Sequence, residues 1–225
     1  MNPEQLDDRP RVIDRRATEH GELVLRRAGD HYEVIADGTF LMDTRDGRSE
    51  RTLVREAIAG RSGLRMLLGG LGVGFSLDEA LSGTAVSQLV VVELEPAVVE
   101  WSRTHLAGLN RHGLDDDRAR LVADDLLAFL RRDAGRYDAI CLDTDNGPGW
   151  LVHPANAGLY DQPGLALLRS RLTVGGLLAV WAAAEDAGFE RRLRSQFGSV
   201  RVERVAVPRG PDDVIYLAGA ATPAR

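Results

Sequence analysis

The chain has 225 residues, of which 44% are hydrophobic and 28% are charged, and this balance is typical of a soluble globular protein with one main core. The 34 acidic residues outnumber the 28 basic ones, so the formal charge is -6 and a general nucleic-acid-binding surface is excluded. No apolar run reaches the ~18 residues that a membrane helix needs, and the first residues lack the apolar core of a signal peptide. We therefore expect a cytoplasmic protein without a membrane partner.

The first 60 residues contain a polar segment, three short β-like runs and one helical pattern. Residues 1–20 are polar and contain two prolines, so we expect an N-terminal arm there. A helical pattern begins at Ser49 and ends at Gly60. Between the arm and this helix, short β-like runs alternate with the turn signals Ala-Gly-Asp and Ala-Asp-Gly, and the runs lie at residues 22–27, 31–36 and 39–42. Residues 21–60 are therefore predicted to form a small antiparallel β subdomain with a linking helix.

From residue 61 onward, strand-like and helical patterns alternate. Apolar runs typical of strands lie at residues 64–70, 87–94, 119–123, 137–143 and 175–183. Helical patterns follow them at residues 75–83, 96–109, 124–133, 162–172 and 187–197. Such alternation predicts a mostly parallel sheet with helices on both faces.

The end of the chain departs from this alternation, because only a short loop separates two strand-like runs at residues 200–207 and 214–219. An antiparallel hairpin that closes a mostly parallel sheet resembles the α/β, Rossmann-like fold of class I methyltransferases. We therefore expect residues 61–225 to form a Rossmann-like nucleoside-binding catalytic domain.

A cluster of glycines follows the first of these strands. Gly69, Gly70, Gly72 and Gly74 remove four side chains from one turn between a strand and a helix, which is where the backbone approaches a ligand in such folds. The cluster could also serve only the packing of the strand against the helix. Glu93 ends the next strand, nineteen residues after Gly74, and an acid there accepts hydrogen bonds from the two hydroxyls of a ribose. Together these residues predict a nucleoside site.

The spacing of the glycines argues against a dinucleotide. Phe75 stands where a dinucleotide-binding turn needs its third glycine, and the Gly-x-Gly-x-Gly spacing instead resembles the motif that binds S-adenosylmethionine. Asp124 and Asp125 follow the third strand, and one of them could accept a hydrogen bond from the adenine amino group while the other caps the next helix. We favour Asp124 for the adenine contact. The predicted cofactor-binding residues are Gly69, Gly70, Gly72, Gly74, Glu93, Asp124 and Asp125.

Asp143 and Asp145 follow the fourth strand, in the stretch Cys-Leu-Asp-Thr-Asp-Asn-Gly-Pro-Gly-Trp. Either carboxylate could take a proton from an attacking group beside a sulfonium, bind a substrate ammonium, or cap backbone amides of the loop. His153 could be a base or a polar surface group, and Trp150 and Tyr160 could line an acceptor pocket or only pack the loop against the sheet. We take Asp143 and Asp145 as the candidate catalytic residues.

No metal site and no disulfide are expected. The single cysteine, Cys141, lies inside an apolar run, where a free cysteine usually behaves as a small buried hydrophobe. His20, His31, His105 and His112 show no metal-ligand spacing with one another or with Cys141.

Six segments of the chain together resemble the spermidine synthase (polyamine aminopropyltransferase) family, and they lie at residues 21–54, 65–74, 90–106, 115–132, 136–149 and 159–181. The similarity spans roughly residues 20–185. It implies a Rossmann-like core after an N-terminal β subdomain, often a homodimer, and decarboxylated S-adenosylmethionine as ligand. By this resemblance Glu93 would hold the ribose and Asp124 the adenine.

The chain also departs from that family. Gly72 stands where the family has an aspartate that holds the aminopropyl amine, and the loop after the fourth strand is one residue shorter, with Asn146 in place of proline. The helix at Ser49 lacks the family's tyrosine and histidine, and the aromatic C-terminal segment is missing. These losses lead us to expect S-adenosylmethionine as the cofactor and methyl-type transfer to a small-molecule acceptor. Aminopropyl transfer from decarboxylated S-adenosylmethionine to an amine is the alternative, and a non-catalytic nucleoside-binding protein is a second alternative.

Overall fold

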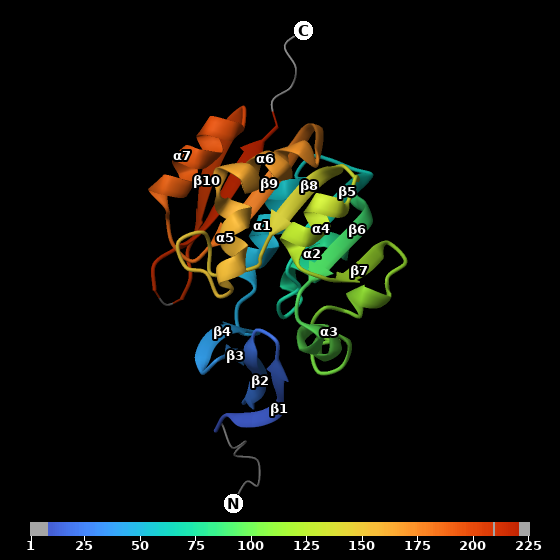
Figure 1. The fold of residues 1–225 in the computed structure, drawn as a ribbon. Coiled ribbons are helices and arrows are strands. Elements are labelled where there is room, and N and C mark those ends of the chain that lie inside the picture. Colours follow the sequence, from blue (N-terminus) through green and yellow to red (C-terminus); the bar gives the residue numbers. More distant parts are fainter. Residues whose placement is uncertain (1–8, 209, 221–225) are drawn as a thin grey trace, which may run out of the picture. The chain divides into compact units, whose positions relative to one another are not determined.

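The computed structural model describes residues 9–208 and 210–220, and the chain divides into two compact units at residues 47 and 48. Figure 1 shows the course of the chain within each unit. The smaller unit is an antiparallel sheet in the order β1-β2-β3-β4. Its strands are β1 (Arg11–Thr18), β2 (Gly21–Ala28), β3 (His31–Ala36) and β4 (Thr39–Asp43). The three predicted β runs are therefore found as β2, β3 and β4.

β1 lies in the segment that we expected to be an arm. Its residues are mostly polar and none of them is buried, so the strand carries no apolar alternation that could be recognised in the sequence. Backbone pairing with β2, from Arg11 opposite Arg27 to Thr18 opposite Gly21, holds β1 in the sheet. Residues 1–8 of the expected arm lie outside the described residues.

The larger unit contains a seven-stranded sheet in the order β10-β11-β9-β8-β5-β6-β7. Five strands are parallel: β5 (Leu64–Gly69), β6 (Val86–Glu93), β7 (Ala119–Ala123), β8 (Tyr137–Leu142) and β9 (Leu172–Ala182). β11 (Asp213–Gly219) pairs antiparallel with β9, and β10 (Ser199–Val205) pairs antiparallel with β11. The predicted α/β, Rossmann-like fold with a C-terminal antiparallel hairpin is confirmed.

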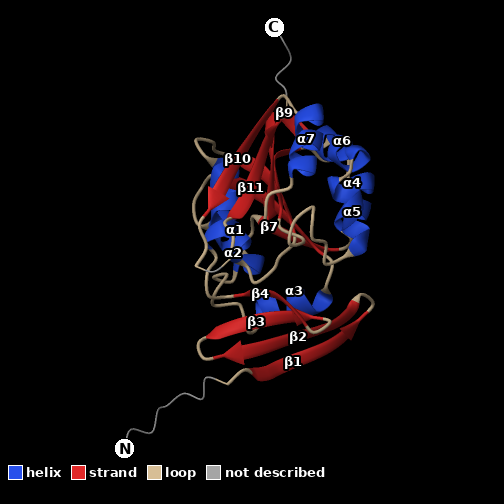
Figure 2. Cartoon of the chain, turned by 90° about the vertical axis from the view of Figure 1, so that its left-hand side faces the viewer, coloured by secondary structure: helices blue, strands red, loops and turns tan. Residues whose placement is uncertain are grey.

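Helices cover both faces of this sheet (Figure 2). One face carries α1 (Arg48–Ile58), α2 (Phe75–Leu81) and α3 (Pro96–Arg103). The other carries α4 (Leu126–Arg132), α5 (Ala157–Tyr160), α6 (Gln162–Ser170) and α7 (Ala187–Gln196). Two short 3-10 turns lie at Gly113–Asp115 and Pro154–Asn156. α5 and the turn before it were not predicted, and α3 ends at Arg103, six residues before the end of the helix that we expected at residues 96–109.

α1 is the helix that we expected to accompany the small β subdomain, and it groups with the larger unit instead. Leu53, Val54 and Ala57 on α1 are buried, and the helix contacts β8, β9 and β11. Burial of this apolar stripe, worth roughly 1.5–3 kcal/mol for a full leucine or valine side chain, assigns α1 to the larger core.

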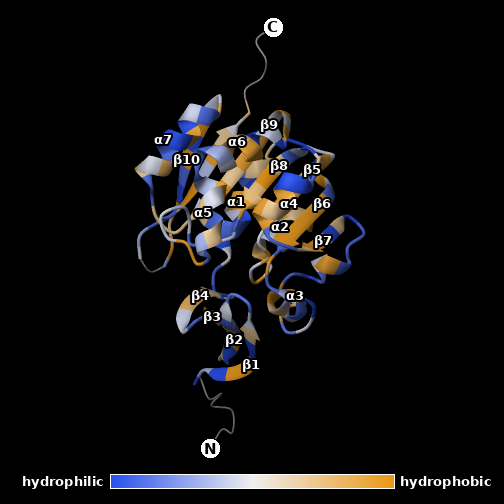
Figure 3. Ribbon diagram, viewed as in Figure 1, coloured by the Kyte–Doolittle hydropathy of each residue, from blue (hydrophilic) through white to orange (hydrophobic). Residues whose placement is uncertain are grey.

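The core of the larger unit lies between the sheet and the helices. Strands β6 and β8 are hydrophobic along most of their length in Figure 3, as expected for parallel strands covered on both faces. Cys141 on β8 is buried among them, and burial raises the pKa of its thiol. The prediction that this cysteine is a buried hydrophobe is confirmed.

Among the described residues, no helix combines the length and the apolar character that a membrane span requires.

Candidate functional site

The predicted site residues meet at one edge of the seven-stranded sheet, where the parallel strands have their carboxyl ends. Backbone hydrogen bonds join neighbouring strands at this edge: Gly70 N donates to Val92 O at 2.9 Å, Asp124 N to Glu93 O at 3.0 Å, and Asp143 N to Gly69 O at 2.8 Å. The four predicted segments are thus fixed side by side, although 74 positions separate Gly69 from Asp143 in the sequence.

At two positions in the turn after β5, neighbouring atoms leave no room for any side chain, so glycine is required. Gly70 has φ +87°, and a Cβ there would lie 2.1 Å from the carbonyl oxygen of Asp143. Gly74 has φ +101°, and its Cβ would lie 2.7 Å from Cβ of Asn110. Only glycine combines a positive φ with such close approach. Gly69 ends β5, and Gly72 lies within the turn.

Glu93 is buried directly beside the glycine turn. Its Oε2 accepts a hydrogen bond from Leu71 N at 2.8 Å, and its Oε1 accepts one from Glu95 N at 2.8 Å. Burial raises the pKa of Glu93, and the neighbouring Glu95 carboxylate acts in the same direction, while hydrogen bonds from the backbone amides of Glu95, Leu71 and Leu94 lower it. The carboxylate is therefore held rigidly at the predicted ribose position.

The two aspartates after β7 have different contacts. Asp125 is the N-cap of α4, and its Oδ1 accepts a hydrogen bond from Ala128 N at 2.7 Å. Asp124 Oδ1 accepts a bond from Asp125 N at 2.9 Å, and the other oxygen forms an ion pair with Arg132. The capping role thus belongs to Asp125. Arg132, which the sequence analysis did not consider, comes from the last turn of α4.

Asp143 lies immediately after β8, and its Oδ2 accepts a hydrogen bond from Ser76 Oγ at 2.9 Å. Ser76 lies on α2, just beyond the glycine turn, and is buried. Burial raises the pKa of Asp143 to about 6, and the carboxylate of Asp213 adds to this effect, while the bond from Ser76 opposes it. Neither Ser76 nor Asp213 carried a pattern in the sequence that could have marked it.

Asp145 is buried, and four donors surround its carboxylate. Oδ1 accepts hydrogen bonds from Val152 N at 2.9 Å and His153 N at 3.2 Å. Oδ2 accepts bonds from Tyr160 OH at 3.3 Å and Thr144 Oγ1 at 3.5 Å. This is the third arrangement considered for the aspartates, in which a carboxylate caps backbone amides of the loop.

The loop between β8 and α5 presents one large apolar side chain. Trp150 is 58% exposed, whereas Tyr160 is buried and packs edge-on against Phe189 at 5.8 Å between ring centroids. Burial and the Asp145 carboxylate raise the pKa of the Tyr160 hydroxyl. Tyr160 therefore packs the loop against the sheet.

Among residues 9–208 and 210–220, no group of three or more histidine, cysteine or acidic side chains could hold a metal ion.

The sequence is similar to a known protein family and to several curated proteins. The model of the spermine/spermidine synthase domain matches residues 65–211. Polyamine aminopropyltransferase 2 of Pseudomonas aeruginosa is 36% identical over 154 residues, which cover 64% of this chain and 42% of that protein. The polyamine aminopropyltransferase of Mycobacterium tuberculosis is 33% identical over 177 residues, which cover 77% of this chain and 33% of that protein. The chain spans less than half the length of these two curated relatives.

Two solved structures are similar in fold. A spermidine synthase in complex with the transition-state analogue AdoDATO has a TM-score of 0.79 at 20% identity, and the match covers 94% of this chain and 74% of that one. The spermidine synthase from Thermotoga maritima has a TM-score of 0.76 at 19% identity, with 94% and 73% covered. At this level of identity the likeness establishes the fold.

Proposed function

Because the chain belongs to the spermine/spermidine synthase family, we propose that it is an aminopropyltransferase, which moves an aminopropyl group from decarboxylated S-adenosylmethionine to an amine. The observation that carries the proposal is the extent of the family match. It spans residues 65–211, and therefore includes the glycine turn, Glu93, Asp124 and Asp143 at one sheet edge. The names of both curated relatives support the same reaction.

The expectation of methyl transfer is wrong. It depended on departures from the family pattern, above all on Gly72 in place of an aspartate. Gly72 and the shorter loop around Asn146 lie within residues 65–211, which match the spermine/spermidine synthase domain, and the curated relatives are aminopropyltransferases. We therefore interpret Gly72 as a change in how the amine of the donor is held, and not in which group is transferred.

Glu93 and Asp124 suit the nucleoside part of the donor. Each oxygen of Glu93 accepts one backbone hydrogen bond and keeps further lone-pair capacity for a ribose hydroxyl. Asp125 caps α4, so we assign the adenine amino group to Asp124, which also pairs with Arg132. Gly70 packs directly against the backbone of Asp143, which holds the glycine turn beside the loop after β8. The donor supplies a positively charged sulfur bonded to the aminopropyl group.

Asp143 is the base of the proposed reaction. An alkylamine is protonated at neutral pH, since its pKa is about 10, so it must lose a proton before it attacks. Asp143 takes this proton, and the nitrogen lone pair then attacks the methylene carbon beside the sulfonium. A C–N bond forms, the C–S bond breaks, and its electron pair stays on sulfur, which becomes a neutral thioether. A carboxyl group with a pKa of about 6 is a stronger base than an ordinary aspartate.

Asp145 has a different role in this scheme. Because both of its oxygens already accept hydrogen bonds, we propose that it holds the loop after β8 in place and does not itself react. Thr144, which lies between the two aspartates, is held by Tyr160 OH at 2.9 Å. The short loop of this chain is thus fixed through Asp145 and Tyr160.

The reaction can be tested with the purified chain, decarboxylated S-adenosylmethionine and a panel of diamines and polyamines. We expect release of methylthioadenosine and a product heavier than the amine by one aminopropyl group, both measured by mass spectrometry. The matched control is Asp143→Asn, which keeps the size and the acceptor for Ser76 but cannot take the proton. It should bind the donor in calorimetry as the parent chain does, and lose turnover.

Two outcomes would contradict the proposal. If the chain binds neither decarboxylated S-adenosylmethionine nor methylthioadenosine, the assignment of the nucleoside site fails. Binding without turnover on any amine would favour the second candidate, a nucleoside-binding protein without catalysis. That candidate is kept because the chain departs from the family pattern at Gly72 and at the helix beginning near Ser49, while Glu93 and Asp124 are present.

The family resemblance also leads us to propose a cytoplasmic homodimer. Light scattering of the purified chain would measure the molar mass directly. A value close to 24.5 kDa at the concentrations used for turnover would contradict the dimer.

A further inference from the structure

Asp213 reaches the candidate site from the last strand of the sheet. It is the first residue of β11, whose next residue, Val214, pairs with Ala182 at the end of β9. Because β11 runs antiparallel to β9, its beginning lies at the same sheet edge as the carboxyl ends of the parallel strands. Asp213 is therefore at the edge that holds Asp143, 70 positions away in sequence.

The two carboxylates project on the same face of the sheet. Leu142 pairs with Val180, and both belong to the core on the face of α4 to α7. The next residues, Asp143 and Trp181, therefore point to the opposite face, which α1 and α2 cover. Trp181 Nε1 donates a hydrogen bond to Asp213 Oδ2 at 3.3 Å on that face.

Each carboxylate is fixed by a buried serine from a different helix. Ser49 Oγ of α1 donates to Asp213 Oδ2 at 2.5 Å, and Ser76 Oγ of α2 donates to Asp143 Oδ2 at 2.9 Å. α1 and α2 pack against each other, so the two serines reach the two carboxylates from neighbouring helices. In the described part of the chain, no arginine forms an ion pair with Asp143.

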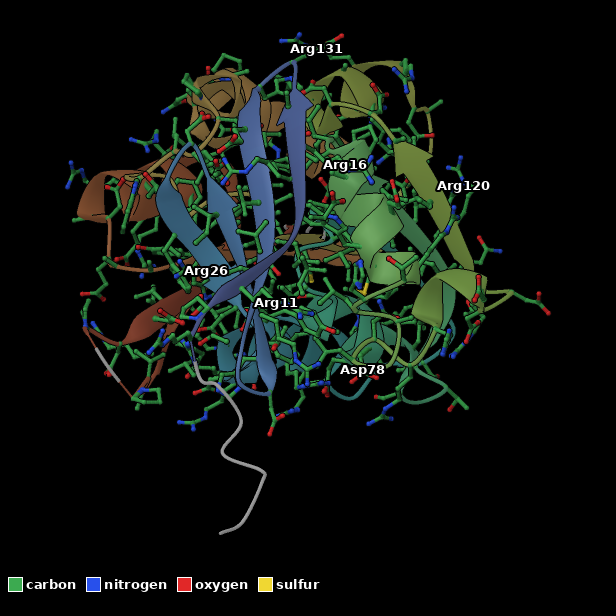
Figure 4. All side chains as sticks on the ribbon, turned by 90° about the horizontal axis from the view of Figure 1, so that it is seen from below. Arg11, Arg16, Arg26, Asp78, Arg120 and Arg131 are labelled. Atoms are coloured by element: carbon green, nitrogen blue, oxygen red, sulfur yellow. The ribbon has the colours of Figure 1, made fainter. Side chains whose placement is uncertain are left out.

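Charged side chains on α1 and α2 have partners of their own. Arg51 of α1 pairs with Asp78 of α2 at 2.5 Å, and Asp78, labelled in Figure 4, also pairs with Arg111 at 3.1 Å. Arg48 donates to Ala206 O at 2.8 Å. The titratable and charged groups on the elements packed against Asp143 are Arg48, Glu50 and Arg51 of α1, Asp78 and Glu79 of α2, Cys141 of β8, Asp145 and Tyr160 after β8, and Asp212 and Asp213 at β11.

We propose that Asp213 is a positioning residue of the acceptor site, which acts through Asp143: its negative charge on the same face of the sheet helps Asp143 to accept the proton of the attacking ammonium. This inference rests on the proposed aminopropyl transfer. An ordinary aspartate is a weak base at neutral pH, and a second carboxylate nearby favours the protonated form of the first. Burial and Asp213 together raise the pKa of Asp143 to about 6, and this agrees with the geometry.

The test compares Asp213→Asn with the parent chain in two measurements. The asparagine keeps an acceptor for Ser49 and Trp181 and removes the charge. In the first measurement, the carboxyl carbons of ¹³C-labelled aspartates are titrated by NMR, and Asp143 is assigned with Asp143→Asn. We expect the midpoint of Asp143 to move down by about one pH unit in Asp213→Asn. An unchanged midpoint overturns the inference, whether or not the protein turns over any amine.

The second measurement is the pH profile of turnover. In Asp213→Asn the acid limb should move to lower pH, and kcat at neutral pH should fall about three- to tenfold, because Asp143 becomes a weaker base. Affinity for methylthioadenosine should not change, since Glu93 and Asp124 are untouched. Asp213→Glu restores the charge and should restore most of the midpoint. A parent chain that never turns over refutes the proposed function, while the NMR result still decides the role of Asp213.

Two further variants separate charge from structure. Ser49→Ala removes one hydrogen bond to Asp213 and leaves the charge, so the Asp143 midpoint should move by less than in Asp213→Asn. If Asp213→Asn does not fold, Asp213→Ser provides a second neutral side chain small enough for the start of β11. A midpoint shift as large in Ser49→Ala as in the neutral Asp213 variants would contradict a role for the charge.

Discussion

Gly70→Ala tests how closely the glycine turn is packed against the loop after β8. Gly70 has φ +87°, and its Cβ would lie 2.1 Å from Asp143 O. A left-handed conformation costs a residue with a Cβ roughly 1–2 kcal/mol, and overpacking adds roughly 1–3 kcal/mol. We therefore expect the free energy of unfolding to fall by about 2–5 kcal/mol. Because the clash is with a backbone atom, relief must move Asp143, so turnover should fall as well.

Two other glycines separate these contributions. Gly60 has φ +69° with no atom within 4 Å of its Cβ position, so Gly60→Ala should show only the conformational cost of about 1–2 kcal/mol. Gly83 has no positive φ and equally open surroundings, so Gly83→Ala should change stability by less than about 0.5 kcal/mol. Urea denaturation followed by circular dichroism gives all three values. If Gly70→Ala costs no more than Gly60→Ala, the contact with Asp143 does not exist and the reasoning is refuted.

Three further predictions concern the carboxylates of the site. Glu93→Gln leaves one oxygen where two now accept hydrogen bonds. We therefore expect its affinity for methylthioadenosine, measured by calorimetry, to fall about 10- to 100-fold. An affinity equal to that of the parent chain would exclude Glu93 from the nucleoside site. Asp145→Asn replaces one buried acceptor by a donor, so the free energy of unfolding should fall by about 1–3 kcal/mol and proteases should cut the loop after β8 faster. Resistance to proteolysis equal to that of the parent chain would show that Asp145 does not hold the loop. Because folding raises the pKa of Asp143, the protonated carboxyl group stabilises the folded state. This contribution is fully present below the pKa of the unfolded chain, near 3.8, and is lost as the pH rises through about 6. Asp143→Asn should therefore become more stable relative to the parent chain between pH 4 and pH 7, and a stability difference that is constant over this range would contradict the raised pKa.

The sequence by itself determined the fold of the larger unit and the sheet edge at which the candidate site residues meet. Strands alternating with helices require a parallel sheet, and the carboxyl ends of parallel strands share one edge. Glycines or acids that follow four successive strands must therefore meet there, whatever the details of the loops. This is why Gly70, Glu93, Asp124 and Asp143 were found together from spacing alone. The departures from the family pattern pointed to the wrong transferred group, because a glycine at position 72, where the family has an aspartate, does not show how the amine of the donor is held.

The tertiary structure decided what local patterns leave open. The polar strand β1 is held by backbone pairing with β2, and such pairing requires no apolar alternation. Two adjacent aspartates are equivalent in sequence, and only the backbone geometry at the start of α4 makes Asp125 the cap. Asp145 became a loop anchor because the chain folds Tyr160 and the amide of Val152 back onto it. Asp213 meets Ser49 across 164 positions, a contact made by the order of strands in the sheet and by no pattern near either residue.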